Sequence, residues 1–236
     1  MILNIYKEKN WTSFDVVAKI KGILKDKEIN SKTKIKVGHA GTLDPLAEGV
    51  LVVLTGVDTK KQDQFMRMEK EYIAEIGFGI STPSQDLETL PKISKKTIGL
   101  ADLKKSIKDI ISEFIGEIDQ KVPSFSAIKV GGKRLYKRAR KEEIAEDLLP
   151  SRKIKIYNID ILDTKRKEIE TKEGLKIIPV VKMKIRCSSG TYIRSLARDL
   201  GKRLETEAVL CSLKRTKIGD LKIEDSIKVS KLTLQK

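Results

Sequence analysis

The chain has 236 residues, of which 39% are hydrophobic and 35% are charged, and its formal net charge at pH 7 is +16. This length allows a substantial hydrophobic core, in one large domain or in a domain with a small appendage. The cationic excess favours a nucleic acid partner, although a general bias towards lysine would produce the same charge. No apolar run approaches the roughly 20 residues that a membrane-spanning helix needs, and residues 1–6 lack the pattern of a signal peptide.

Cysteine and histidine usage weighs against metal and disulfide sites. Cys187 and Cys211 are the only cysteines, and their separation suits neither a disulfide framework nor a zinc site. His39 is the only histidine, which excludes a multi-histidine metal site. We therefore expect reduced cysteines, a cytoplasmic protein and no bound metal.

The N-terminal segment predicts a strand over residues 1–6, a polar turn, and a helix that ends near residue 25. Thr12 and Ser13 are typical N-cap residues, and apolar side chains then recur at helical spacing. Asn10 in the turn tolerates a positive φ angle.

Residues 38–49 predict a tight loop in front of the apolar stretch 50–54. Three glycines and one proline in twelve residues cannot sustain a helix. The loop contains one aspartate, Asp44, between apolar neighbours. A carboxylate in such surroundings needs a cation, so we expect an arginine from elsewhere in the chain, unless Asp44 only caps a turn.

The next part of the chain alternates helical and extended patterns. Residues 58–68 predict a polar helix, and the alternation over residues 70–77 predicts a half-buried strand that includes Tyr72. A loop over residues 79–92 precedes an amphipathic helix over residues 99–115, which we expect to serve packing only.

Residues 122–152 predict a basic insertion. A helix over residues 133–140 has five cations among eight residues with Tyr136 between them, which is typical of an element that follows a phosphate backbone. A solvated charged helix would have the same composition. Residues 142–150 predict an acidic, mobile linker.

The last third predicts three strands and a helix. The apolar side chains of the strand over residues 153–162 change phase, which indicates a bulge. After a strand over residues 178–187, Thr191 can cap a helix. Arg194 lies in the first turn of that helix, where the dipole disfavours a cation, so we expect an anionic partner. A strand over residues 209–219 follows.

Several of these segments resemble motifs of the tRNA pseudouridine synthase B family. Residues 38–51, G-H-A-G-T-L-D-P-x-A-x-G-x-L, are similar to its catalytic loop. Further similarities are G-T-Y-I-R-S-L-A-x-D-L-G at residues 190–201, P-x-[YF]-S-A-x-K-x-x-G-x-x-x-Y-x-x-A-R at 123–140, and L-x-R-x-x-x-G at 213–219. The resemblance extends from Tyr6 to Gly219 in the order of the family.

Two motifs depart from the family pattern. In the opening K-P-x-G-x-T-S, Glu8 and Asn10 replace the proline and the glycine, while Lys7 remains. In T-x-T-x-D-x-x-G, Ser84 and Thr89 replace the second threonine and the glycine. The departure in the opening motif weakens that motif but not the resemblance as a whole.

The resemblance implies an α+β pseudouridine synthase fold, with a mixed, largely antiparallel central sheet flanked by helices and a basic RNA-binding insertion. It implies one catalytic domain over residues 1–236, without a separate C-terminal RNA-binding domain, because only about 17 residues follow Gly219. The implied reaction converts uridine to pseudouridine at position 55 in the T-loop of tRNA. It has no redox or phosphoryl step, so we expect no cofactor or metal. We expect tRNA as the partner of a monomer.

The resemblance also implies roles for individual residues. Asp44 is the nucleophile or the base at the ribose, and a covalent and a glycal route both remain open. Arg194 pairs with Asp44, while Tyr72 stacks on the target base and takes part in removing the C5 proton. His39 fills the space of the flipped nucleotide or stacks within the T-loop, with a packed core histidine as the alternative. The other expected pocket or RNA contacts are Phe125, Ile193 and Leu213, with Lys60, Lys129, Lys133, Arg134, Tyr136 and Arg140.

Three alternatives remain open from the sequence. A non-catalytic RNA-binding module explains the charge but not a carboxylate in the RNA-facing loop. A hydrolase with an aspartate nucleophile would need a D-x-D arrangement, which Asp44 lacks. A guide-RNA-dependent synthase normally carries an additional C-terminal domain.

Overall fold

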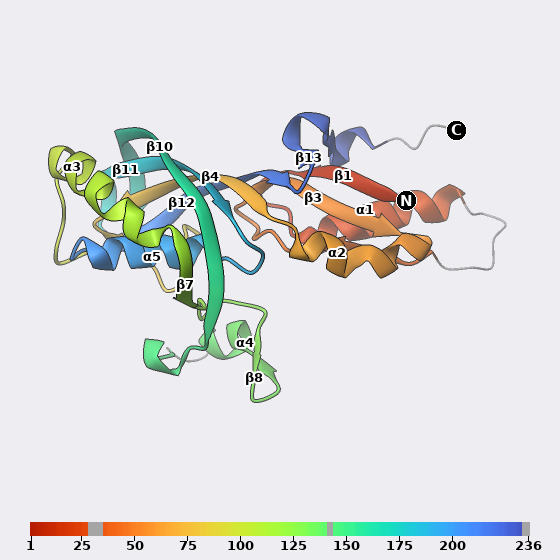
Figure 1. Cartoon of the computed structure of the whole chain (residues 1–236), viewed down its shortest axis with the longest axis horizontal. Helices are drawn as coiled ribbons and strands as arrows, with labels where there is room; N and C mark the ends of the chain where they lie inside the picture. Colours follow the sequence, from red (N-terminus) through yellow and green to blue (C-terminus); the bar gives the residue numbers. More distant parts are fainter. Residues whose placement is uncertain (28–34, 141–143, 233–236) are drawn as a thin grey trace. The chain divides into compact units, whose positions relative to one another are not determined.

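The computed structural model describes residues 1–27, 35–140 and 144–232 (Figure 1). The chain forms two compact units, which we call the first and the second unit. Met1–Tyr72 and Leu213–Lys236 make up the first unit, and Ile73–Ser212 makes up the second. Strands β4 (Lys70–Phe78) and β12 (Ala208–Ile218) each contribute residues to both units.

The first unit contains a sheet with the strand order β14-β1-β3-β12. Strand β1 pairs antiparallel with β3, from Ile2 opposite Leu54 to Lys7 opposite Gly49. β2 pairs antiparallel with β3, whereas β12 pairs parallel with β3 and β14 parallel with β1. The strands are β1 (Ile2–Lys7), β2 (Val37–Ala40), β3 (Glu48–Thr55), β13 (Leu221–Lys222) and β14 (Ile227–Lys228).

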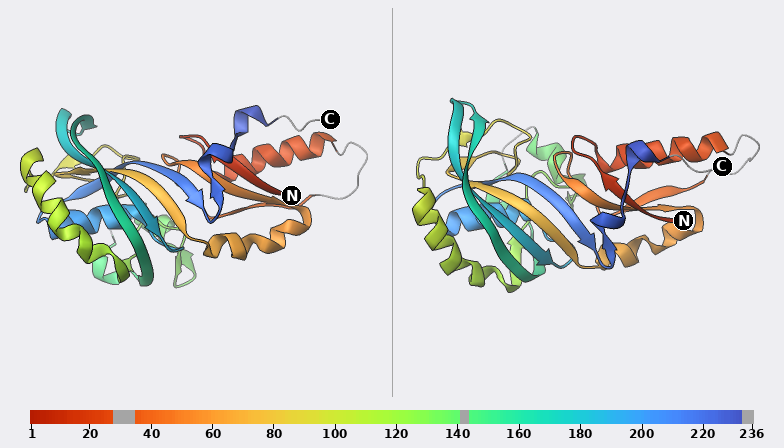
Figure 2. Two further views of the ribbon diagram at one scale, coloured as in Figure 1. Left: turned by 45° about the horizontal axis from the view of Figure 1, so that its top comes forward. Right: turned by 90° about the horizontal axis from the view of Figure 1, so that it is seen from above.

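Helices cover both faces of this sheet, as the views of Figure 2 show. Leu51 and Val53 of β3 pack against α1 (Ser13–Lys27), and the alternate residues of β3 pack against Phe65 of α2 (Gln62–Arg67). The predicted start of α1 is confirmed, because Thr12 and Asp15 exchange reciprocal side chain to backbone hydrogen bonds of 2.8 and 3.0 Å. Asn10 in the preceding turn has φ 68°.

The second unit contains strands in the order β12-β4-β11-β10-β7. β10 (Ser151–Thr171) and β11 (Gly174–Cys187) form a long antiparallel hairpin, and β7 (Gly116–Lys121) pairs with the start of β10. Register shifts near Ile156 and Ile161 confirm the predicted irregularity. β10 is about twice as long as predicted, because its charged second half has no apolar pattern and is held by pairing with β11.

Two helices belong to the second unit. α3 (Leu100–Ile110) buries Leu103, Ile107 and Ile110 as predicted, but its last predicted turn is a 3-10 helix. α5 (Ile193–Arg203) does not begin with a Thr191 cap, which corrects the prediction. Tyr192 occupies the N-cap position, and the Thr191 hydroxyl donates to the carbonyl of Ser188 instead.

The insertion is folded differently from the prediction. Its glycine pair, Gly131 and Gly132, has φ 58° and 78° and turns the chain between β8 (Lys129–Val130) and β9 (Lys133–Arg134), so the predicted helix is reduced to α4 (Leu135–Ala139). The described part of the predicted mobile linker is packed, since Leu149 is only 4% exposed among the apolar residues of the insertion.

The remaining elements are short. Residues 79–92, predicted as a loop, include β5 and the first residue of β6, which pair with each other, and the predicted helix over residues 58–68 begins as a 3-10 helix. These elements are β5 (Ile80–Ser81), β6 (Lys92–Ile93), and the 3-10 helices Gly56–Lys61, Ile111–Phe114, Glu146–Leu148, Ile223–Asp225 and Val229–Lys231.

Two helical glycines should respond to alanine with opposite signs. A Cβ at Gly201 of α5 would lie 2.6 Å from the backbone nitrogen of Ala208, whereas a Cβ at Gly22 of α1 would meet nothing within 4 Å. We expect Gly22→Ala to raise the free energy of unfolding by about 0.5–1 kcal/mol and Gly201→Ala to lower it by about 1–3 kcal/mol. Urea unfolding measures both, and equal shifts would contradict the close approach at Gly201.

Candidate active site

The loop that carries Asp44 connects β2 and β3 in the first unit. It is shorter than predicted, because β2 extends to Ala40 and β3 begins at Glu48. Leu43 and Ala47 are buried on either side of Asp44, which is itself half-buried. The backbone N–H of Ala47 donates to the carbonyl of Asp44 at 3.1 Å, so the loop closes through a turn.

Two side chains from the N-terminal segment hold this loop by its backbone. The hydroxyl of Ser13 donates to the carbonyl of Leu43 at 3.1 Å and accepts the N–H of Leu43 at 2.9 Å. The ammonium of Lys7 donates to the carbonyls of Trp11 at 2.6 Å and Pro45 at 3.4 Å. The residues on both sides of the predicted catalytic aspartate are therefore fixed.

A buried arginine joins the two ends of the loop. Arg215 of β12 is 2% exposed, and its guanidinium donates to the carbonyls of Gly41 at 3.0 Å, Thr42 at 3.4 Å and Val50 at 2.8 Å. Gly49 lies against the backbone of this arginine with φ +108°, and a Cβ at Gly49 would be 2.2 Å from the Arg215 oxygen. Only glycine fits there.

Lys7 and Asp44 interact electrostatically. Lys7 is fully buried, and burial lowers its pKa to about 8, while the negative charge of Asp44 acts in the opposite direction. Arg215 adds to the lowering, because a second cation disfavours the charged ammonium. The loop therefore places a carboxylate within the field of a buried cation.

His39 and Tyr72, also in the first unit, are both largely buried. Burial, and then the charge of Arg215, lower the pKa of His39, so the ring is neutral at pH 7. Its Nδ1 atom is buried and has no hydrogen-bond partner within the described part of the chain. Tyr72 in β4 is 8% exposed. A neutral ring with an unused polar atom is compatible with the predicted stacking role and leaves an acceptor or donor for a ligand.

Arg194 has an anionic partner within the second unit, as its position in a first helical turn predicts. It is 5% exposed in α5, and its Nε atom lies 3.8 Å from the carboxylate of Asp86. Its guanidinium also donates to the carbonyls of Ser84 at 2.9 Å and Phe125 at 3.0 Å. These contacts orient the guanidinium in a fixed direction.

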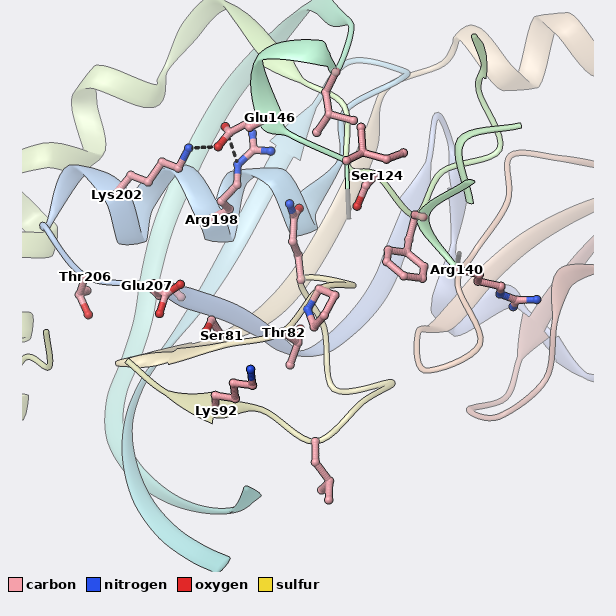
Figure 3. A pocket seen from close by; sticks show the side chains of 18 of the residues that line it. Ser81, Thr82, Lys92, Ser124, Arg140, Glu146, Arg198, Lys202, Thr206 and Glu207 are labelled. Atoms are coloured by element: carbon pink, nitrogen blue, oxygen red, sulfur yellow. Dashed lines mark hydrogen bonds and ion pairs between the residues drawn. The ribbon is translucent and has the colours of Figure 1, made fainter. Parts of the chain in front are cut away.

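A cavity of about 670 Å³ lies in the second unit. Figure 3 shows the side chains that line it. Side chains of α5, of the insertion and of residues 81–92 line it. Phe125 and Arg140 are the predicted site residues among them, and Arg198, Lys202 and Glu146 meet at one wall. The wall that carries Phe125 also holds Arg194 through the Phe125 carbonyl.

The other predicted RNA contacts lie mainly at the surface. The guanidinium of Arg140 lies 5.6 Å from the ring centroid of Tyr136. Ile193 is 3% exposed and packs in the interior. The side chain of Lys133 lies outside what the structure describes. The exposed or partly exposed residues of this group are Lys60, Lys129, Arg134, Tyr136, Arg140 and Leu213.

Three residues that build the site had no role in the sequence analysis. Lys7, Asp86 and Arg215 each occupy a motif position, but their patterns carry no sign of the contacts that they make. Their motif positions were the only signal, and the structure buries each of them to 5% exposure or less.

Residues 27–193 match the model of the TruB family pseudouridylate synthases, N-terminal domain. The chain belongs to the TruB family. It is 43% identical over 223 residues to tRNA pseudouridine synthase B of Parabacteroides distasonis, covering 94% of this chain and 87% of that protein. Its identity to the Clostridium tetani protein of the same name is 42%, over 96% of this chain and 70% of that protein.

Solved structures extend the TruB likeness to the fold. A chain of a Cbf5–Nop10–Gar1 complex superposes with a TM-score of 0.65 at 28% identity. A chain of an H/ACA ribonucleoprotein bound to a substrate RNA containing 2′-deoxyuridine gives 0.64 at 26% identity. Each match covers 98% of this chain, which spans about half the length of these two proteins, 53% and 51%.

These matches confirm three predictions. The chain is a TruB-family pseudouridine synthase, an isomerase, and its α+β fold with a mixed central sheet is that of the synthase structures.

Among the residues that the structure describes, none of the helices combines the length and the apolar character that crossing a membrane requires.

The buried ammonium of Lys7 should make stability depend on pH. The pKa of Lys7 falls from 10.5 to about 8 on folding, so the unfolded chain binds this proton more tightly. Unfolding then takes up a proton between pH 8 and 10.5, and the free energy of unfolding rises with pH in that window. We expect the wild type to gain about 1–3 kcal/mol across it relative to Lys7→Met.

Urea unfolding at several pH values measures this difference. Lys9→Met is the control, because Lys9 is exposed and its substitution removes the same charge without the burial. A wild-type curve parallel to that of Lys7→Met would contradict the assignment of Lys7 as a buried cation with a lowered pKa.

Proposed function

We propose that this chain isomerises uridine to pseudouridine at position 55 in the T-loop of tRNA, with Asp44 as the catalytic residue. The observation that carries the proposal is the loop itself. Its carboxylate sits between backbone positions held by Lys7, Ser13 and Arg215, within a chain of the TruB family. Relatives that are 42–43% identical and named tRNA pseudouridine synthase B support tRNA as the substrate.

The reaction needs a carboxylate at the ribose of a flipped nucleotide. Asp44 attacks C1′ as the N1–C1′ bond breaks, or it takes a proton from C2′ to form a glycal. The freed uracil turns so that C5 faces C1′. In the first route, C5 bonds to C1′ as the bond between C1′ and the Asp44 carboxylate breaks; in the glycal route, C5 bonds to C1′ and the proton returns to C2′. The proton on C5 then leaves and N1 takes up a proton. Either route depends on accurate placement of the carboxylate, which the backbone hydrogen bonds around Asp44 provide.

We infer that Arg194 pairs with Asp44 in the working enzyme, with the two units forming one catalytic domain. Its contacts with Asp86, Ser84 and Phe125 support this role, because they fix the orientation of the guanidinium, a planar group whose geometry matches a carboxylate. A guanidinium beside the carboxylate also fixes its orientation through charge-assisted hydrogen bonds.

Base extrusion assigns roles to two further residues. Tyr72 stacks on the extruded uracil and assists removal of the C5 proton, and the neutral ring of His39 stacks where the base has left. The orphaned Nδ1 of His39 supports this placement, because a buried polar atom without a partner is costly unless a ligand satisfies it. The exposed cations of the insertion hold the phosphate backbone.

Asp44→Asn should abolish pseudouridine formation while tRNA binding persists. Asparagine keeps the shape of the side chain but can act neither as nucleophile nor as base, so we expect a loss of at least about 100-fold in rate. Tritium release from C5-labelled uridine in tRNA measures the rate, and filter binding measures the affinity.

Asp63→Asn is the matched control, because Asp63 is an exposed aspartate on α2 of the same unit. It should leave both quantities unchanged. Tritium release by Asp44→Asn at the wild-type rate would contradict the catalytic role, and absence of release by the wild type would contradict the reaction.

A further inference from the structure

We propose that the cavity beside α5 binds a phosphate of the substrate RNA next to the target nucleotide, and that the Glu146 carboxylate occupies this site in the free protein. The inference rests on the proposed function, because it assumes an RNA substrate at Arg194. It adds an RNA-binding subsite and a built-in competitor for it, both within the second unit.

The cavity is continuous with the residues that hold Arg194. Phe125 lines the cavity and accepts a hydrogen bond from Arg194 through its carbonyl at 3.0 Å. Gln85 also lines it and directly follows Ser84, the other carbonyl acceptor of Arg194. An RNA strand whose target nucleotide lies at Arg194 therefore has its neighbouring phosphate at the mouth of this cavity.

Helix α5 extends the charge of Arg194 along the cavity. Arg198 and Lys202 follow at intervals of four residues, which places them on the same face of the helix at steps of about 6 Å. Both line the cavity, and Figure 3 shows their charged ends turned towards Glu146. This row of cations is suited to successive negative charges of a backbone.

Glu146 takes the place that an anion would fill. Its carboxylate lies 3.6 Å from Nε of Arg198 and accepts a hydrogen bond from Lys202. Burial raises its pKa, but the hydrogen bond from Lys202 and the charge of Arg198 outweigh burial and lower it overall. The segment that carries Glu146 is a single 3-10 turn of the insertion, Glu146–Leu148.

One donor at this wall is left unused by Glu146. Arg198 donates to Asp199 at 2.8 Å and to the carbonyl of Lys121 at 3.2 Å, but its second terminal nitrogen is buried without a hydrogen-bond partner in the described part of the chain. A phosphate offers more acceptor oxygens than a carboxylate and can serve both Arg198 and Lys202. A phosphate therefore fits the donor set better than Glu146 does.

The net charge of the cavity lining also favours an anionic ligand. Five lining residues are cationic and two are acidic, and displacement of Glu146 would leave one acidic residue. The cations are Lys92, Arg140, Lys172, Arg198 and Lys202, and the acids are Glu146 and Glu207. Such a cavity attracts a polyanion, and the attraction weakens with salt.

Helix α5 provides a matched pair of variants for the subsite. Lys202 and Arg203 are neighbours, each is paired with a glutamate, and each side chain is 53% exposed, but only Lys202 lines the cavity. We expect Lys202→Ala to weaken binding of tRNA and to reduce the slope of log affinity against log salt by about 0.7–0.9, the value for one lost phosphate contact. Arg203→Ala should leave the slope unchanged.

Variants of Glu146 and Glu113, the glutamates paired with Lys202 and Arg203, test whether Glu146 competes with the phosphate. Glu146→Gln should tighten tRNA binding by about two- to fivefold, because the phosphate no longer displaces an ion pair. Glu113→Gln, which breaks the pair with Arg203, should not tighten it. In the Lys202→Ala background, Glu146→Gln should lose most of its effect. Thermal unfolding of each variant separates these effects from damage to the fold, since a merely structural role for Glu146 would lower stability without raising affinity.

Three outcomes would overturn the inference. Equal salt slopes for Lys202→Ala and Arg203→Ala would show that the cavity lies off the path of the RNA, as would tRNA binding by Glu146→Gln no tighter than by Glu113→Gln. Tighter binding of inorganic phosphate but not of tRNA by Glu146→Gln would indicate a small-anion site instead. Failure of the proposed function is distinct, because it appears as absent tritium release by the wild type whatever the binding data show.

Discussion

The candidate active site depends on the hydrogen bonds that the guanidinium of Arg215 donates to the backbone around the Asp44 loop. This guanidinium lies inside the first unit and binds the carbonyls of Gly41, at the start of the Asp44 loop, and of Val50, in the strand β3 that follows the loop. A single planar group with several donors can close a loop in this way, whereas a lysine ammonium could not hold the same geometry. Gly49 is needed so that the backbone of β12 can approach closely enough.

Burying two cations next to a loop is costly unless their hydrogen bonds are satisfied and a negative charge lies close. Lys7 and Arg215 meet the first condition with backbone carbonyls, and Asp44 contributes to the second. In the second unit, Arg194 follows the same principle with Asp86 and two carbonyls. Both halves of the proposed catalytic pair thus sit in frameworks in which buried charge and backbone acceptors enforce one geometry.

The sequence predicted elements where the apolar period is strong and local. α1, α3 and β4 follow patterns of this kind, and the motifs located the Asp44 loop and the strand β12. The charged half of β10 was missed because strand pairing leaves no period in polar residues, and the insertion helix was overestimated because Gly131 and Gly132 turn the chain. The supports from Lys7 and Arg215 could not be predicted, since side chain to carbonyl bonds across long sequence separations have no local signature.

The hydrogen bonds that Lys7, Ser13 and Arg215 make with the Asp44 loop all reach its main chain, and this has a consequence for how the protein can change. Thr42 and Pro45 supply carbonyls to Arg215 and Lys7, yet both residues are exposed. Their side chains can therefore be substituted without loss of the hydrogen bonds that Arg215 and Lys7 donate to their carbonyls. Selectivity for RNA can therefore be varied at Thr42 and Pro45 without a change in the rigidity of the loop. Libraries of substitutions at these two exposed positions offer a route to altered RNA preference with the backbone around Asp44 unchanged.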